Sequence, residues 1–149
     1  MMYEFFISNY LNTAGTTVVS SEELLYYVPI IEPDRSVTEP IIKCEMGKAG
    51  SSEFTLNPMH PFYNRLCQMK TVIRVEYDGN IIFRGRVLTI DSNKIKGTKK
   101  VHLEGDLAFL NDSYQEGVEE GDRPKTTIYE YLQNVIKQHN AQMDVEGSE

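Results

Sequence analysis

Three histidines, His60, His102 and His139, are the side chains best suited to metal ligation or to proton transfer near neutral pH. They belong to separate segments: a predicted loop, a predicted strand, and the end of a predicted helix, where a positive charge suits the helix dipole. No HxxxH or CxxC spacing accompanies them. The sequence therefore predicts neither a metal site nor a bound cofactor.

Nucleophilic catalysis requires a nucleophile beside a base that a third group orients. Cys67 and His60 are seven residues apart around a predicted short helix, a spacing that does not by itself bring them within hydrogen-bond reach. Asp91, Glu104 and Asp106 could supply a carboxylate pair for glycoside hydrolysis, but any acidic β protein offers such pairs. No G-x-S-x-G, P-loop or dinucleotide-binding glycine pattern occurs. We therefore expect no catalytic residues and no enzyme activity.

Other polar and aromatic side chains are candidates for contacts between subunits. Arg84 and Arg86 flank Gly85 in a predicted strand, and two interpretations of this pair stay open. The arginines form a solvated face with cross-strand partners such as Glu76 or Glu104, or they form a subunit contact. The tyrosines suspected at an interface are Tyr26, Tyr27 and Tyr63.

Bulk composition indicates one globular domain spanning residues 1–149, with 40% hydrophobic and 25% charged residues. No apolar run approaches the ~20 residues of a membrane span, and the start, MMYEFFISNY, lacks the features of a secretory signal. Two cysteines, Cys44 and Cys67, are too few for a disulfide framework. Two buried or half-buried free thiols are expected, and a bridge between them is the less favoured alternative.

Charge is unevenly distributed along the chain. Residues 1–102 contain 12 Lys and Arg against 11 Asp and Glu, whereas residues 103–149 contain 3 against 11. A chain with this balance is a poor candidate for binding phosphate backbones. Specific recognition of nucleic acid is therefore not expected.

The central predicted element is an antiparallel meander over residues 71–111. Residues 71–77 alternate in the manner of a half-buried strand, and 78–80 form a tight hairpin turn in which glycine takes a positive φ. In the second strand the alternation breaks at Gly85, which predicts a one-residue bulge there or a close backbone approach. A third strand includes 101–103, and Asp106 caps a short helical turn.

The remaining segments predict shorter elements around this meander. They are a strand at 3–7, a turn at 9–16, an extended piece at 17–21, a helix or strand at 22–31, a loop at 32–40, a hairpin from 41–46 to 53–56, and a short helix at 61–66. Phe62, Leu66 and Met69 are expected to face inwards.

The clearest helix spans 128–139, where Thr127 and Glu130 form a capping box and Asn140 closes the last turn. Its apolar stripe includes Ile128, Leu132, Val135 and Ile136 and is expected to pack on the sheet. Residues 143–149 are expected to fray. Together the patterns predict a mainly β, antiparallel, bulged barrel-like domain with two or three short helices, one near the C-terminus.

Three runs of sequence resemble the amino-terminal region of phage tail-tip and baseplate hub proteins, including the prophage endopeptidase tail proteins. The runs are AGSSEFTLNPMHPFYNRL, YDGNIIFRGRV and VHLEGDLAFLNDS. Their order and spacing carry the resemblance, which covers residues 41–142. In such proteins a helix ending in a His-Asn pair, here His139-Asn140, leads into further domains. The chain thus resembles the first domain of a larger hub.

The resemblance implies a structural role in a phage or prophage virion. The implied assembly is a homotrimeric ring that joins the tail tube or distal tail protein to a spike or lysin. The tape-measure protein and DNA would pass through its channel. Part of the acidic segment 116–122 would line or border that channel and repel phosphate, or the segment is a solvated loop that keeps the protein soluble. Two alternatives stay open: a tail-associated endopeptidase that degrades the cell wall, and a carbohydrate-binding β module.

Overall fold

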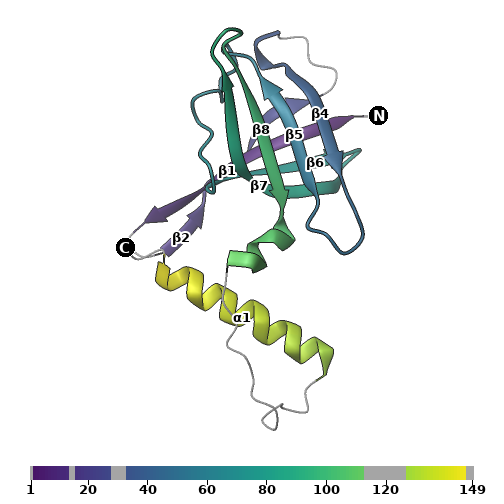
Figure 1. The fold of residues 1–149 in the computed structure, drawn as a ribbon, viewed down its shortest axis with the longest axis vertical. Coiled ribbons are helices and arrows are strands. Elements are labelled where there is room, and N and C mark those ends of the chain that lie inside the picture. The colour runs from purple at the N-terminus through teal and green to yellow at the C-terminus, as the bar shows by residue number, and fades with distance from the viewer. Residues whose placement is uncertain (1, 14–15, 28–32, 113–126, 147–149) are drawn as a thin grey trace. The chain divides into compact units, whose positions relative to one another are not determined.

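The computed structural model describes residues 2–13, 16–27, 33–112 and 127–146. These residues form two compact units (Figure 1). The first contains residues 1–11 and 18–107 and holds most of the β-sheet. The second contains residues 12–17 and 108–149 and includes the C-terminal helix.

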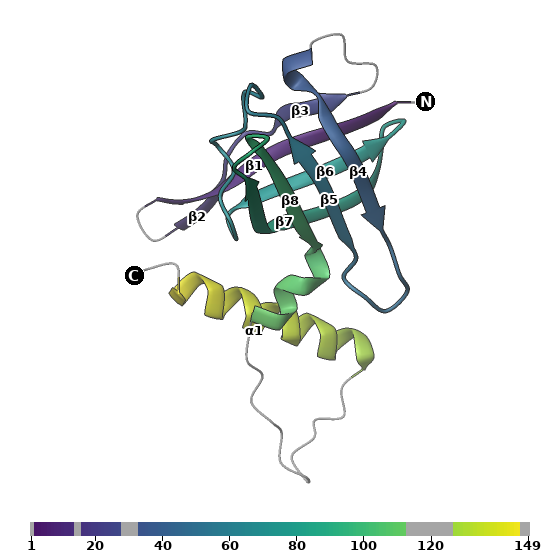
Figure 2. The ribbon, with the colours of Figure 1, turned by 45° about the horizontal axis from the view of Figure 1, so that its top comes forward.

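Eight antiparallel strands form one curled sheet, a half-barrel, which confirms the predicted mainly β class. The strands are β1 Tyr3–Thr13, β2 Thr16–Val19, β3 Glu23–Tyr27, β4 Val37–Lys43, β5 Ser51–Leu56, β6 Thr71–Tyr77, β7 Asn80–Asn93 and β8 Thr98–Gly105. Their order is β2-β1-β6-β7-β8-β5-β4, and β3 pairs with β1. Figure 2 shows β7, β8, β5 and β4 following one another across the sheet.

The hairpin between β6 and β7 forms as its turn residues predict. Asp78 and Gly79 both have positive φ, 47° and 79°, as the mirror-image two-residue turns require. The predicted bulge at Gly85 is wrong, because Gly85 pairs in register with Ile73 on one side and with Gly105 on the other. The register shifts instead place the extra residues of β7 at Ile82 and Leu88.

Gly85 is nevertheless required by a close backbone approach, which was the alternative predicted for it. A Cβ atom at this position would collide with the carbonyl of Glu104 and would lie 2.9 Å from the Phe83 ring. The neighbouring strand therefore excludes a side chain here. The close approach lets β7 and β8 pack against each other within the curled sheet.

The hydrophobic core lies on the concave side of the sheet and is contained within the first unit. Its most deeply buried side chains include Phe5, Leu25, Phe54, Leu56, Ile73, Val75, Val87 and Val101. Phe54 and Leu56 alternate with half-buried residues along β5, the period-2 pattern of a strand with one face buried.

Several sequence predictions differ from the observed local structure. Residues 9–13 continue β1 instead of turning, and the ambiguous segment 22–31 contains a strand, β3. The predicted loop 32–40 contains a 3₁₀ helix, η1 Pro33–Arg35, and the start of β4. Residues 61–66 form successive turns instead of a helix. Phe62 and Leu66 are buried as predicted, whereas Met69 is exposed.

The second unit contains most of the 3₁₀ helix η2 Asp106–Asp112 and the α-helix α1 Ile128–Glu146. The predicted capping box is present: Glu130 N donates to Thr127 Oγ1 at 3.2 Å, and Thr127 N donates to Glu130 Oε2 at 2.8 Å. Closure at Asn140 is wrong, because α1 continues to Glu146 through part of the segment expected to fray. The predicted burial of the apolar stripe is also wrong for three of its four residues: Ile128, Leu132 and Ile136 are 80%, 50% and 49% exposed. The fourth, Val135, is half-buried.

Candidate interaction surface

An apolar pocket of about 410 Å³ lies where the two edges of the curled sheet face each other. Strands β1 and β3 form one wall and edge strand β4 forms the other. The lining residues are Tyr3, Phe5, Tyr26, Pro40, Ile42 and Ile82. We call this pocket and its rim the apolar seam. Its volume falls within the ~300–1,000 Å³ of typical ligand pockets.

Aromatic contacts fix the floor of the apolar seam and leave its rim accessible. Phe5 is 2% exposed, and its ring packs edge-on against Tyr26 at 5.6 Å and against Phe54 at 6.0 Å between centroids. Tyr3 packs on Tyr77 at 4.7 Å and remains 43% exposed. The floor is therefore rigid, whereas the rim can contact a partner.

The bulges of β7 and β4 shape this rim. Ile82 is the extra residue of the β7 bulge and is 38% exposed at the edge of the pocket. In β4, Glu39 and Pro40 both stand opposite Phe54, and Glu39 has a φ of 53°. A proline and a bulge at a sheet edge hinder pairing with a further strand. The geometry of the apolar seam thus favours partners that insert side chains over partners that add a strand.

A charged row crosses the convex face of the sheet. His102 on β8 lies between Glu53 on β5 and Asp91 on β7, with Nδ1 3.4 Å from Glu53 Oε2 and Nε2 3.1 Å from Asp91 Oδ2. Lys100 Nζ lies 3.2 Å from Glu53 Oε1. His102 lies in a strand, as predicted, and its half-buried ring contacts carboxylates of the two neighbouring strands.

The other two histidines are buried and belong to separate units. His60 is 2% exposed, and its Nδ1 accepts a hydrogen bond from the Phe62 amide at 3.2 Å. Burial lowers its pKa from the ordinary value; contacts with the backbone of Leu25 and Arg35 partly oppose this, and the charge of Arg35 adds to the lowering. His139 lies inside α1 and is 8% exposed, so its predicted position at a helix end is wrong.

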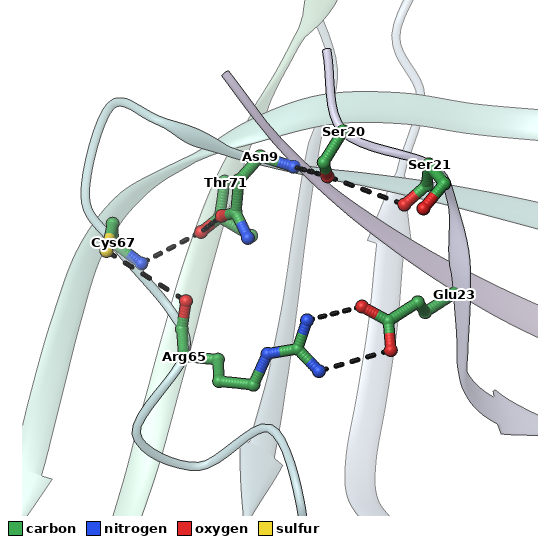
Figure 3. A network of polar contacts seen from close by, with 7 residues as sticks. All are labelled: Asn9, Ser20, Ser21, Glu23, Arg65, Cys67 and Thr71. Atoms are coloured by element: carbon green, nitrogen blue, oxygen red, sulfur yellow. Dashed lines mark hydrogen bonds and ion pairs between the residues drawn. The ribbon is translucent and has the colours of Figure 1, made fainter. Parts of the chain in front are cut away.

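The structure does not bring the candidate nucleophile and base together. Cys67 Sγ donates a weak hydrogen bond to the carbonyl of Arg65 at 3.9 Å (Figure 3), whereas the Nδ1 atom of His60 is held by Phe62. Cys67 N donates to Thr71 Oγ1 at 2.8 Å, and Thr71 Oγ1 donates to Asn9 Oδ1 at 2.5 Å. Cys67 thus contributes to the attachment of the loop before β6. Both cysteines are free, as predicted, but both are exposed, so their predicted burial is wrong.

The three candidate carboxylates each contact a different side chain. Asp91 contacts His102, Glu104 Oε1 accepts from Arg86 Nε at 2.6 Å, and Asp106 Oδ2 lies 3.7 Å from Arg84 Nη1. The predicted cross-strand partner of Arg86 is therefore confirmed, but Arg86 is buried, so the predicted solvated face is wrong for this residue. Burial raises the pKa of Asp106, and the charge of Arg84 opposes that shift. The three carboxylates thus take part in three separate contacts.

The suspected interface tyrosines have different surroundings. Tyr26 lines the apolar seam. The Tyr63 hydroxyl donates to the carbonyl of Gly97 at 2.7 Å, and its ring lies under Lys99 Nζ at 4.1 Å. Tyr63 therefore anchors a loop within the unit, and Tyr27 is half-buried in β3.

Two further properties concern only the described ranges. Within them, no three His, Cys, Asp or Glu side chains gather in a way that could hold a metal ion. Neither α1 nor the short helices there combine the length and the apolar character that crossing a membrane requires.

Comparisons with protein-family models, with curated proteins and with solved structures find no significant match to this chain.

Proposed function

We propose that this chain is a structural subunit of a phage or prophage tail tip or baseplate hub, and that it assembles through the apolar seam. The observation that carries the proposal is the pocket between the sheet edges, where an aromatic floor is combined with exposed apolar rim residues. Interfaces concentrate their binding energy where large apolar and aromatic side chains enter a preformed pocket. The three runs of sequence that resemble hub proteins support the same assignment through their order and spacing along the chain.

The subunit would act by presenting a rigid surface, without chemistry of its own. Copies would form an oligomeric ring, a trimer by resemblance, between the tail tube or distal tail protein and a cell-facing spike or lysin. The tape-measure protein and DNA would pass through the ring, and the protein would reside in the virion tail. Because Glu39 and Pro40 hinder strand addition at the β4 edge, neighbouring subunits would insert side chains into the apolar seam.

Solution mass measured over a range of concentrations tests the proposal. Ile82→Lys places a charge at the rim of the pocket and should shift the assembly towards monomers. Leu88→Lys is the matched control, because Leu88 is the second bulge residue of β7, is 42% exposed, and lies outside the pocket lining. A wild-type chain that stays monomeric at high concentration, or a loss of mass in the control alone, would overturn the proposal.

A carbohydrate-binding module remains the second candidate, and the exposed face of Tyr3 beside Tyr77 is the observation that favours it. Aromatic rings of this kind offer a flat apolar surface to a sugar ring. A glycan pull-down with wild type and Tyr3→Ala separates the two proposals. Binding of the wild type to the glycan, together with loss of that binding in Tyr3→Ala, would support the carbohydrate-binding module.

A further inference from the structure

The turn between β7 and β8 presents an isoleucine between two lysines. Ile95 is 98% exposed, and Lys94 and Lys96 on either side of it are exposed as well. Neither lysine forms an ion pair with a residue that the structure describes. We call residues 94–96 the knob. Single exposed apolar side chains are common on protein surfaces, so the knob implies a contact only if the molecule also carries a site that fits it.

The knob is held in place by the turn itself and by the loop before β6. Asn93 Oδ1 accepts hydrogen bonds from Ile95 N at 3.0 Å and from Lys96 N at 3.1 Å. The Tyr63 hydroxyl donates to the carbonyl of Gly97 at 2.7 Å, and Gly97 has a φ of 67°. An ordered segment loses less conformational freedom when it binds than a flexible one does. The knob is therefore preformed for insertion into a pocket.

The apolar seam is a pocket that fits such a knob, and both belong to the first unit. Its volume is about 410 Å³, and the buried ring of Phe5 forms its floor. The bulge at Glu39 and Pro40 hinders the addition of a strand at the β4 edge, whereas a turn delivers one side chain without strand pairing. Since Ile95 is 98% exposed, it does not occupy the apolar seam of its own copy. A knob that enters the apolar seam therefore belongs to a second copy.

Carboxylates stand at both walls of the apolar seam. Glu39 is exposed on the β4 wall and forms no ion pair with a described residue. Asp78 Oδ1 accepts a hydrogen bond from the Met2 amide at 2.7 Å, at the start of the β1 wall. Lys43, the next lysine along β4, lines a different pocket. The walls thus complement two lysines that flank an inserted side chain. The acidic segment 116–122 lies outside the described residues, so its channel position stays a prediction.

A second turn, between β4 and β5, also presents an apolar side chain. Met46 is fully exposed there. Lys48 Nζ pairs with Glu45 within the same turn, which carries no net charge over residues 44–50. Met46 therefore lacks the flanking cations that the carboxylates of the apolar seam favour, and it serves as the matched control for Ile95.

We propose that Ile95 of one copy inserts into the apolar seam of a second copy, where Lys94 and Lys96 face the carboxylates of Glu39 and Asp78. This inference rests on the proposed assembly through the apolar seam and names its occupant. The knob and the apolar seam are unlike surfaces, so the contact is head-to-tail and can generate a ring. Burial of the isoleucine supplies most of the affinity, because exposed ion pairs contribute little.

A labelled cyclic peptide with the sequence of residues 92–99 tests the contact without requiring assembly. Its receptor is the full-length Ile95→Gln chain, whose apolar seam is intact and has no competing knob. Adding Ile82→Lys to this chain should weaken peptide binding roughly tenfold or more, because the buried isoleucine would meet a charge. Leu88→Lys is the control and should leave binding unchanged, since Leu88 lies outside the pocket lining. Absence of binding to the Ile95→Gln chain, or equal binding after either lysine substitution, would overturn the contact.

Assembly of the whole chain tests the same contact. Ile95→Gln should raise the dissociation constant of the assembly roughly tenfold or more, since it removes a buried isoleucine, whereas Met46→Gln should leave it unchanged. An equimolar mixture of Ile95→Gln and Ile82→Lys should form one-to-one dimers, because the intact knob of the second chain enters the intact apolar seam of the first. An equal loss of assembly in Met46→Gln would overturn the choice of the knob.

The charges of the knob are tested by assembly at low salt. Lys94→Gln with Lys96→Gln should raise the dissociation constant by roughly twofold to fivefold, because exposed charges are weakly screened under these conditions. Lys70→Gln with Lys137→Gln removes two exposed lysines elsewhere and should leave it unchanged. An equal effect of the two double substitutions would overturn the pairing of the knob with the carboxylates.

The outcomes separate this inference from the proposed ring. If Ile82→Lys is monomeric and Ile95→Gln assembles like the wild type, the apolar seam mediates assembly but another surface fills it, and the inference is wrong. If the peptide binds but the wild-type chain stays monomeric at high concentration, the contact is retained and the proposed ring is refuted.

Discussion

His60 is an ionisable side chain buried in the first unit, in surroundings that poorly solvate a charged ring. Its ring lies 5.8 Å from the Phe62 ring between centroids, and its Nε2 atom is buried without a well-aligned hydrogen-bond partner among the described residues. Protonation would place an imidazolium in that environment. The lowered pKa of His60 expresses this cost, and desolvation is its main cause.

The lowered pKa predicts that acid destabilises the fold through His60. In the unfolded chain this histidine takes up a proton near its ordinary pKa of about 6.5, whereas the folded chain takes it up only at lower pH. Below about pH 6.5 the unfolded state therefore binds more protons, and the free energy of unfolding decreases as the pH falls. Above that range both states are neutral at this residue, so His60 adds no pH dependence.

Chemical denaturation of wild type and His60→Gln at about pH 7.5 and about pH 5 measures this effect. The wild type should lose more unfolding free energy than the variant between the two conditions. Asp106 is present in both chains; burial raises its pKa, so its effect on stability has the opposite sign and cancels in the comparison. If the unfolding free energies of the two proteins changed equally with pH, His60 would not take up a proton on unfolding.

At the scale of the elements, Gly85 determines how closely β7 and β8 can approach. Gly85→Ala should lower the free energy of unfolding by roughly 2–3 kcal/mol or more, because the new methyl group meets the carbonyl of Glu104 and the Phe83 ring. Arg84→Ala is the neighbouring control, since Arg84 is exposed and its nearest carboxylate, Asp106, is 3.7 Å away. Denaturant titration measures the stability of both variants. If Gly85→Ala were as stable as the wild type, the close approach of the two strands would be contradicted.

Elements with local signals could be predicted from the sequence. The turn of Asp78 and Gly79 and the capping box of Thr127 with Glu130 depend on residues within four positions of one another, and both are confirmed. The sequence predicts the break in alternation along β7, but its cause is a pair of bulges at Ile82 and Leu88. Gly85 between them suggested one bulge, because glycine is common at both bulges and close approaches.

The apolar seam could not be predicted from the sequence, because curling of the sheet brings its residues together. Tyr3, Ile42 and Ile82 are about forty positions apart from one to the next and meet only through the pairing of β1 with β6 and of β4 with β5. Tyrosines are common at interfaces, and Tyr26, one of the three predicted interface tyrosines, lines the pocket. The contact role of Tyr26 itself stays a prediction.

For the whole molecule, the apolar seam should couple folding to assembly. An apolar pocket left open in a single copy keeps Tyr3 and Ile82 in contact with water, and a neighbouring copy would cover them. A partner that binds only the folded chain stabilises it in proportion to the logarithm of its concentration. The stability of the protein should therefore depend on how much of it is present.

Thermal unfolding at increasing protein concentration should show this dependence. A free concentration about a hundredfold above the dissociation constant adds about 2.7 kcal/mol, which raises the midpoint for a chain of this size by roughly 5–10 °C. Ile82→Lys should unfold at one temperature whatever its concentration, whereas Leu88→Lys should keep the wild-type dependence because its side chain lies outside the pocket. A wild-type midpoint that stays constant across the series would mean that the folded chain does not associate through the apolar seam.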